Sequence, residues 1–91
     1  MYYVVAYDIE SDRRRNRVMK TLKDFGQRAQ YSVFECDTDK KHYLRLKDRL
    51  DKLINHDKDS IIFFHLCKKC ETQIERIGID KKVLDKSEYI V

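Results

Sequence analysis

Asp8 is the residue whose type and position in this sequence most favour chemistry. It follows the apolar run of residues 2–7, where a carboxylate is unfavourable unless it reaches solvent, a cation or backbone N–H groups. One interpretation is that Asp8 accepts hydrogen bonds from the start of a following helix. The other is that Asp8 binds a hard cation, because Mg²⁺ is held by one or two carboxylates together with water and phosphate oxygens. We predict a functional carboxylate at this position.

Four arginines follow Asp8 at positions expected for the first turn of a helix: Arg13, Arg14, Arg15 and Arg17. The helix macrodipole makes cations unfavourable there by roughly a few tenths of a kcal/mol each, and like charges four residues apart add a small penalty. One interpretation is a solvated face that nearby acids balance. The other is that the guanidinium groups, beside free helix N–H groups, bind phosphate next to Asp8. The second interpretation predicts a nucleic-acid-binding surface.

The cysteines and histidines give weaker signals. Cys67 and Cys70 have the spacing of half a zinc site, but no second cysteine pair or correctly spaced histidine pair follows. We favour a structural turn there, and a metal shared between subunits with His65 or Cys36 is the alternative. The three histidines are scattered, and no serine or cysteine is placed to form a nucleophile–base pair with them.

The composition indicates one small globular domain. The chain has 91 residues, of which 42% are hydrophobic and 40% charged, with no proline and two glycines. Its net charge of +4 favours polyanionic partners such as nucleic acid. The first residues lack the features of a signal peptide, no apolar run is long enough to span a bilayer, and an odd number of cysteines suits a reducing compartment. We therefore expect a cytoplasmic protein with no membrane partner.

The apolar pattern of the first half predicts a strand, a helix and a further extended segment. Residues 2–9 are typical of a buried strand, and Asp12 is suited to cap a helix that ends near Gly26. In residues 28–37 the apolar positions alternate until the phase slips at Phe34. Such a slip indicates a bulge, a kink, or two short strands back to back.

The second half of the sequence again predicts a helix followed by a strand. Thr38 or Asp39 is suited to open a helix, which ends at residues 55–57, and residues 60–66 form an apolar run of strand length. A short third helix before Gly78 and a last short strand at residues 88–91 complete the pattern.

The resulting order, β-α-β(-β)-α-β, predicts an α+β fold: a ferredoxin-like, split-βαβ antiparallel sheet with two main helices on one face. We expect a single domain over residues 1–91. Because the other sheet face is bare, we also expect a two-fold homodimer, with the C-terminal tail, about residues 83–91, pairing across the interface.

Four motifs in this order and spacing resemble one known family nearly end to end. They are Tyr-Asp-Ile at residues 7–9, Arg-Arg-Arg-Asn-Arg-Val at 13–18, Gln-Tyr-Ser-Val-Phe-Glu-Cys at 30–36 and Leu-Cys-x-x-Cys at 66–70. The sequence is similar to the CRISPR-associated Cas-two family, small metal-dependent nuclease proteins that accompany the CRISPR integrase. It departs from the usual family pattern at Glu10-Ser11 and at Ala29. The first departure concerns metal or phosphate geometry, and the second concerns only packing.

The resemblance implies a ferredoxin-like homodimer in which Asp8 from each subunit meets across the two-fold axis to hold a divalent metal. It places the family's functional positions on Tyr7, Asp8, Arg15, Arg17, Arg28 and Phe34. We add Arg14 to the nucleic-acid-binding set because it belongs to the arginine cluster. Single-stranded RNA is the implied substrate, with double-stranded DNA as the alternative, and Cas-one integrase dimers are the implied protein partner.

Three functions follow. The first is a Mg²⁺-dependent CRISPR endonuclease that takes part in spacer acquisition in antiviral defence, with Asp8 as the catalytic and metal-binding residue. The second is a non-catalytic dimeric adaptor that bridges integrase dimers and binds spacer DNA. The third is a generic ferredoxin-like RNA-binding domain that reads bases from its bare sheet face.

Overall fold

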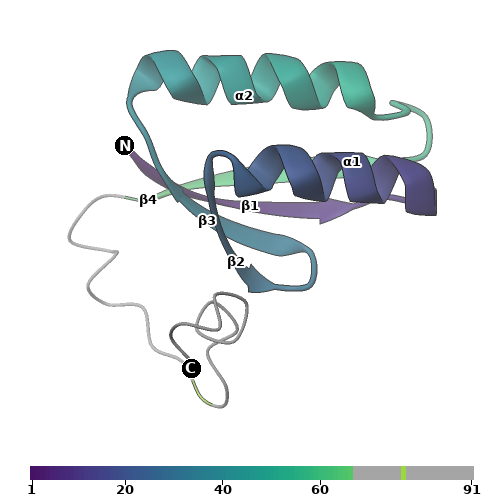
Figure 1. Ribbon diagram of the computed structural model, residues 1–91, viewed down its shortest axis with the longest axis horizontal. Coiled ribbons are helices and arrows are strands. Elements are labelled where there is room, and N and C mark those ends of the chain that lie inside the picture. The colour runs from purple at the N-terminus through teal and green to yellow at the C-terminus, as the bar shows by residue number, and fades with distance from the viewer. Residues whose placement is uncertain (67–76, 78–91) are drawn as a thin grey trace.

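The computed structural model describes residues 1–66 and residue 77. Its elements follow the predicted order (Figure 1): β1 Tyr2–Asp8, α1 Asp12–Lys23, β2 Gly26–Gln30, β3 Val33–Asp37, α2 Lys40–Leu53 and β4 Ser60–Leu66. The predicted third helix, the last strand with the pairing tail, and the Cys67–Cys70 turn lie outside the described residues.

The four strands form one antiparallel sheet in the order β2-β3-β1-β4. Among the described strands, β1 is therefore an inner strand, which suits its apolar sequence, and β4 lies at an edge. Both helices cover the same face, side by side (Figure 1). The predicted α+β, ferredoxin-like class is confirmed. The sheet register sets Asp8, the last residue of β1, opposite Ser60, the first residue of β4.

The core lies between the sheet and the two helices. Side chains of a strand alternate between its faces, and Tyr3, Val5 and Tyr7 of β1 point toward the helices and are buried. They pack with apolar residues from α1 and α2, among them Leu22 and Leu46, which are fully buried. The period of two in β1 and the helical spacing in α1 and α2 therefore serve one common core.

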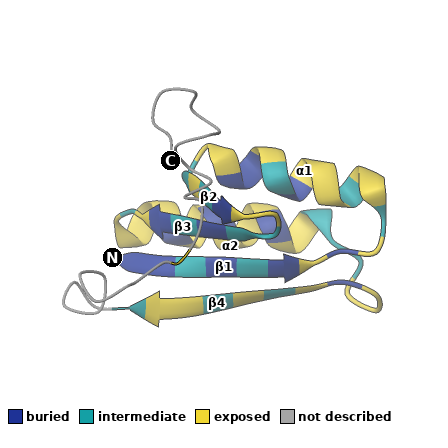
Figure 2. Cartoon of the chain, turned by 90° about the horizontal axis from the view of Figure 1, so that it is seen from below, coloured by how far each residue is buried: buried dark blue, intermediate teal, exposed yellow. Residues whose placement is uncertain are grey.

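On the opposite face of the sheet, no helix or strand of the described residues covers the strands. Ile62 and Phe64 of β4 are each 50% exposed, and they lie opposite Ala6 and Val4 of β1 in the antiparallel register. Residues directly opposite each other share a sheet face, so these four side chains form one apolar strip, which we call the sheet-face patch. Figure 2 shows the exposed residues along β4.

Two predicted helix boundaries were wrong in detail. Ser11, rather than Asp12, is the N-cap of α1: its side chain accepts a hydrogen bond from the backbone N–H of Arg14 at 3.2 Å. Gly26 does not end the helix, which stops at Lys23, but is the first residue of β2. A Cβ atom at Gly26 would overlap the carbonyl oxygen of Glu35 on the neighbouring strand, so the glycine permits close strand pairing.

The phase slip in residues 28–37 reflects two structural features. The segment contains two strands, β2 and β3, joined by a turn at residues 31–32, and their register shifts between Arg28 and Gln30. α2 begins at Lys40 and is capped by Asp39, which accepts a hydrogen bond from the backbone N–H of His42 at 2.8 Å. Within the described part of the chain, neither helix has the length and hydropathy that crossing a bilayer requires.

Candidate metal and nucleic-acid site

The Asp8 side chain is exposed at the end of β1. Its carboxylate makes no hydrogen bond or ion pair with any other residue in the described part of the chain. The interpretation of Asp8 as a helix-capping group is wrong, because Ser11 holds that position at the start of α1. The carboxylate is therefore available to a ligand from outside the chain.

The donor set around Asp8 fits a hard cation only in part. An exposed, unpaired carboxylate suits Mg²⁺, which keeps several water ligands and takes one or two carboxylates together with phosphate oxygens. Among residues 1–66 and 77, however, no three His, Cys, Asp or Glu side chains come together as a metal site. Asp8 is thus not part of a ready-made cluster of protein ligands within the described part of the chain.

The four arginines of α1 divide into two kinds. Arg14 donates from Nε to Asp59 Oδ2 at 2.7 Å and from Nη2 to Asp59 Oδ1 at 3.1 Å. The Asp59 side chain has no exposed surface, and the Arg14 guanidinium holds the pKa of that carboxyl well below its usual range. Arg14 was predicted to bind nucleic acid, but its guanidinium is committed to an internal bidentate pair.

Arg15 is also bound within the described part of the chain, whereas Arg13 and Arg17 are not. Its Nη1 donates to the carbonyl oxygen of Ile9 at 2.9 Å, and its Nη2 pairs with the carboxylate of Asp12. Arg13 and Arg17 are exposed and have no hydrogen bond or ion pair with other described residues. Because they are four residues apart, they share a face of α1, and they are its free guanidinium groups.

Tyr7 and Phe34 are core residues. Tyr7 is 5% exposed and Phe34 fully buried, their rings stack at 6.3 Å, and the Tyr7 hydroxyl donates to the carbonyl oxygen of Tyr31 at 3.0 Å. The prediction that these two rings bind nucleic acid conflicts with their burial in the described chain, because neither ring has a face open to a base.

Arg28 on β2 is the remaining predicted residue. Its guanidinium lies 5.9 Å from the centre of the Phe34 ring, a cation–π contact, and its Nε is buried without a hydrogen-bond acceptor in the described part of the chain. The buried Nε is closed to solvent, so an anion from outside can approach only the exposed part of this half-buried side chain. Phe34 therefore supports Arg28 from beneath.

Asp59 is the residue that sequence reasoning missed. It lies 45 residues from Arg14, so no local spacing links the two. The available signal was an acid directly before the apolar run that begins at Ser60, where a buried carboxylate requires a cation, combined with an excess of arginine at the start of α1.

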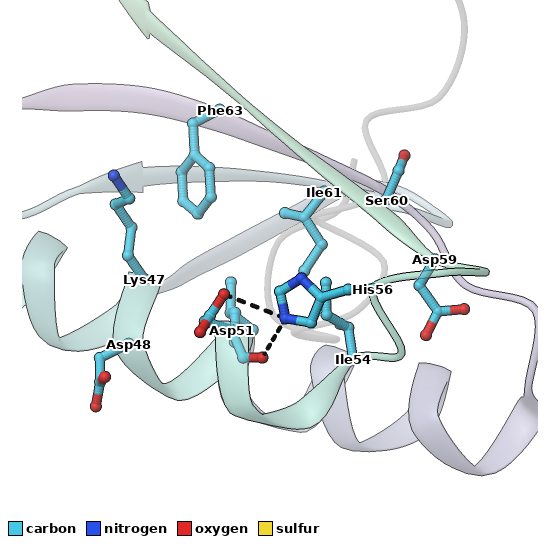
Figure 3. Close-up of a pocket in the computed structure, with 10 residues that line it drawn as sticks. Lys47, Asp48, Asp51, Ile54, His56, Asp59, Ser60, Ile61 and Phe63 are labelled. Carbon is cyan, nitrogen blue, oxygen red and sulfur yellow. Dashed lines mark hydrogen bonds and ion pairs between the residues drawn. The ribbon is translucent and has the colours of Figure 1, made fainter.

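A cleft of about 530 Å³ opens between the end of α2 and the start of β4 (Figure 3). Ile61 and Phe63 supply its apolar lining, and His56 Nε2 lies 3.3 Å from Asp51 Oδ1. The Ser60 hydroxyl points away from His56 (Figure 3), so these two residues do not form a serine–histidine pair in the cleft.

Comparison with known proteins gives consistent matches. The family model described as CRISPR associated protein Cas2 matches residues 1–74. A protein of Chloroflexus aurantiacus named CRISPR-associated endoribonuclease Cas2 1 is 42% identical over 79 residues, which cover 86% of this chain and 85% of that protein. A Halalkalibacterium halodurans protein named CRISPR-associated endonuclease Cas2 is 35% identical, covering 86% of each chain. The crystal structure of Streptococcus pyogenes Cas2 aligns with a TM-score of 0.78 at 35% identity, over 86% of this chain and 100% of that one.

Proposed function

This chain belongs to the CRISPR associated protein Cas2 family, as its motifs predicted, and from that premise we propose that it is a metal-dependent endonuclease acting in spacer acquisition in CRISPR antiviral defence. The observation that carries the proposal is the Asp8 carboxylate. It is exposed and lacks a partner among the described residues, and the arginine-rich start of α1 follows it directly.

The residues of this chain have separate tasks in phosphodiester hydrolysis. A bound divalent cation, for which we propose Mg²⁺, supplies an activated water and neutralises charge on the phosphate. Asp8 holds that cation through its carboxylate oxygens. Arg17 and Arg28 bind and orient the phosphate and stabilise the charge that develops on it. Arg15 fixes the turn after Asp8, because its Nη1 holds the carbonyl oxygen of Ile9.

We propose that two copies pair and that both Asp8 side chains serve one ion. Val4, Ala6 and Asp8 follow the period of two along β1, so Asp8 points to the same face as the sheet-face patch. In the proposed dimer the two patches face each other across a two-fold axis, with Ile62 and Phe64 in the interface and the two Asp8 residues near the axis. The second copy thus supplies the carboxylate that one chain lacks.

The proposed substrate is single-stranded RNA, with double-stranded DNA as the alternative. The names of the two relatives differ on this point. The Chloroflexus aurantiacus protein is named an endoribonuclease, and the Halalkalibacterium halodurans protein an endonuclease. A free guanidinium binds the phosphates of either polymer. The assay that tests the activity therefore has to include both.

The decisive experiment compares Asp8→Asn with Asp48→Asn on labelled RNA and DNA in the presence of Mg²⁺. Both changes turn an exposed carboxylate into an amide of the same shape, but Asp48 lies on α2 and pairs only with Lys52 among the described residues. We expect cleavage to fall at least roughly a hundredfold for Asp8→Asn and to stay unchanged for the control. Undiminished cleavage by folded Asp8→Asn would exclude Asp8 as the metal ligand.

A second candidate is the non-catalytic adaptor that bridges Cas-one integrase dimers and supports spacer DNA. The absence of a cluster of three or more possible metal ligands among the described residues favours it, because Asp8 alone provides few groups for catalysis. In a spacer-acquisition assay, the adaptor role predicts full activity for Asp8→Asn and loss for Arg17→Glu. The reverse result would favour the catalytic role.

A further inference from the structure

The buried carboxylate of Asp59 joins two turns that are far apart in the sequence. Its Oδ1 accepts the backbone N–H of Glu10 at 3.0 Å and Arg14 Nη2 at 3.1 Å, while its Oδ2 accepts Arg14 Nε at 2.7 Å and the backbone N–H of Asn55 at 2.9 Å. We call this set of four hydrogen bonds the Asp59 clamp. It ties the turn between β1 and α1 to the turn between α2 and β4.

One peptide group of the first turn is held at both of its polar ends. The carbonyl oxygen of Ile9 accepts Arg15 Nη1 at 2.9 Å, and the N–H of Glu10, on the same peptide, donates to Asp59 at 3.0 Å. Such a group has little freedom to rotate. This peptide begins at Ile9, the residue after Asp8. Fixing its orientation therefore restrains the backbone on the C-terminal side of Asp8.

Among the described residues, only the backbone restrains where the Asp8 side chain begins. Its side chain has no hydrogen bond or ion pair within the described part of the chain, so no neighbouring group orients it directly. On the N-terminal side, strand pairing holds the Asp8 backbone opposite Ser60, which is the residue next to Asp59. The Asp59 clamp holds it from the other side.

We propose that Asp59 is a positioning residue for the Asp8 site: its buried carboxylate fixes the Ile9–Glu10 peptide and thereby the place at which Asp8 receives a divalent cation. This inference rests on the proposed function of Asp8. Groups behind the direct ligands commonly control metal affinity or activity by about 10- to 100-fold, which sets the effect expected here.

The test uses the full chain, ¹⁵N-labelled, as wild type, Asp59→Asn and the matched control Asp48→Asn. Asp59→Asn keeps the shape of the side chain but replaces one carboxylate oxygen, which accepts hydrogen bonds, by an NH₂ group, which can only donate them. Mn²⁺ serves as the probe, and two readouts do not require catalysis: hydrogen exchange of the Glu10 amide, and the Mn²⁺ concentration that broadens the resonances around Asp8. Cleavage of RNA and DNA is measured alongside.

We expect Asp59→Asn to stay folded at the assay temperature, to exchange its Glu10 amide at least tenfold faster, and to need about 10- to 100-fold more Mn²⁺. The control should match the wild type. Unchanged Mn²⁺ affinity in folded Asp59→Asn, or no Mn²⁺ binding near Asp8 in the wild type, overturns the inference. If Asp59→Asn unfolds, the wild-type Glu10 amide decides: protection equal to that of β1 amides supports the clamp, and free exchange overturns it.

The same data separate this inference from the proposed function. A wild type that binds Mn²⁺ at Asp8 with the expected Asp59 dependence, yet cleaves neither polymer, removes the nuclease function and keeps the clamp. Cleavage that Asp59→Asn leaves unchanged, together with unchanged Mn²⁺ affinity, removes the clamp and keeps the nuclease.

Discussion

Phe34 contributes to the candidate site without facing a ligand. Its ring is fully buried, stacks with Tyr7 and lies under the Arg28 guanidinium. A substitution at Phe34 therefore acts through the position of Arg28 and through the core. An effect on nucleic-acid binding at this residue reports packing rather than base stacking.

Cys36 shows how burial controls a single titrating group. Its side chain is 1% exposed, and burial raises the pKa of its thiol to about 11. The pKa of Tyr3, beside it, is also raised by burial. Both groups are therefore neutral in the folded protein over the physiological range, and Cys36 has little thiolate to react with oxidants or metals.

We predict that Cys36 makes the protein sensitive to base. Because its folded pKa, about 11, lies above the unfolded value near 9, the unfolded chain loses the proton first as pH rises. The stabilising contribution is complete below about pH 8.5 and declines by about 1.4 kcal/mol per pH unit toward pH 11. Urea unfolding of wild type and Cys36→Ala between pH 7.5 and 10.5 measures it. The difference in unfolding free energy should shrink as pH rises, and a constant difference would refute the assignment.

At the scale of elements, α1 combines structural and available arginines within two turns. Asp59 holds Arg14. Ile9 and Asp12 hold Arg15. Arg17, in contrast, is exposed and unpaired within the described chain. The internal pairs offset the cost of cations at the positive end of the helix. The free residues retain that cost and are suited to bind phosphate.

We predict that replacing Arg17 affects the salt dependence of nucleic-acid binding, whereas replacing Arg14 affects thermal stability. Arg17→Ala should reduce the slope of log affinity against log salt concentration by about one and leave the thermal midpoint within about 1 °C. Arg14→Ala should lower the midpoint by at least roughly 5 °C, because it leaves Asp59 buried without its cation, and should leave the salt slope unchanged. Binding titrations at several salt concentrations and thermal unfolding measure both. A slope change of one in Arg14→Ala would restore Arg14 to the phosphate-binding set.

The elements could be predicted from the sequence because their signals are local. The apolar run at residues 60–66 gave both ends of β4, and Asp39, one of the two residues expected to open the second helix, caps α2. Choosing Ser11 over Asp12 as the cap was not possible, because both residue types cap helices well.

The state of each site residue depended on tertiary contacts. Which arginine is free is decided by Asp59, a partner 45 residues from Arg14, and the burial of Phe34 is decided by how β2 and β3 pack under α1 and α2. Neither is visible in spacing along the chain. The local sequence pointed to Asp8 and the arginine cluster as candidates. The fold determines which of those arginines are paired within the chain and which are free.

At the scale of the whole molecule, the two faces of the sheet differ. One is covered by α1 and α2, and the other exposes Ile62 and Phe64 at 50% each, beside a β4 edge with no strand partner in the described chain. Exposed apolar side chains that line up across neighbouring strands are typical of an interaction surface. This asymmetry is the basis for the proposed dimer.

We predict that Phe64→Lys weakens self-association at least tenfold, because it places a charge in the proposed interface. Leu44→Lys is the matched control: Leu44 is equally exposed, at 51%, but lies on α2, on the helix side of the molecule. Sedimentation equilibrium measures both variants and the wild type. A monomeric wild type would instead leave the sheet face free and favour the RNA-binding domain.

The Asp59 clamp also sets an order of events during translation. Asp8 leaves the ribosome early, but Asp59, which holds the Glu10 amide, is added 49 residues after Glu10, and β4 follows it. Contacts that close so long a loop form only once both ends exist. A nascent or truncated chain ending before Asp59 therefore carries the arginines of α1 without a fixed Asp8. The fixed position of Asp8 is therefore completed only after Asp59 has been added to the chain.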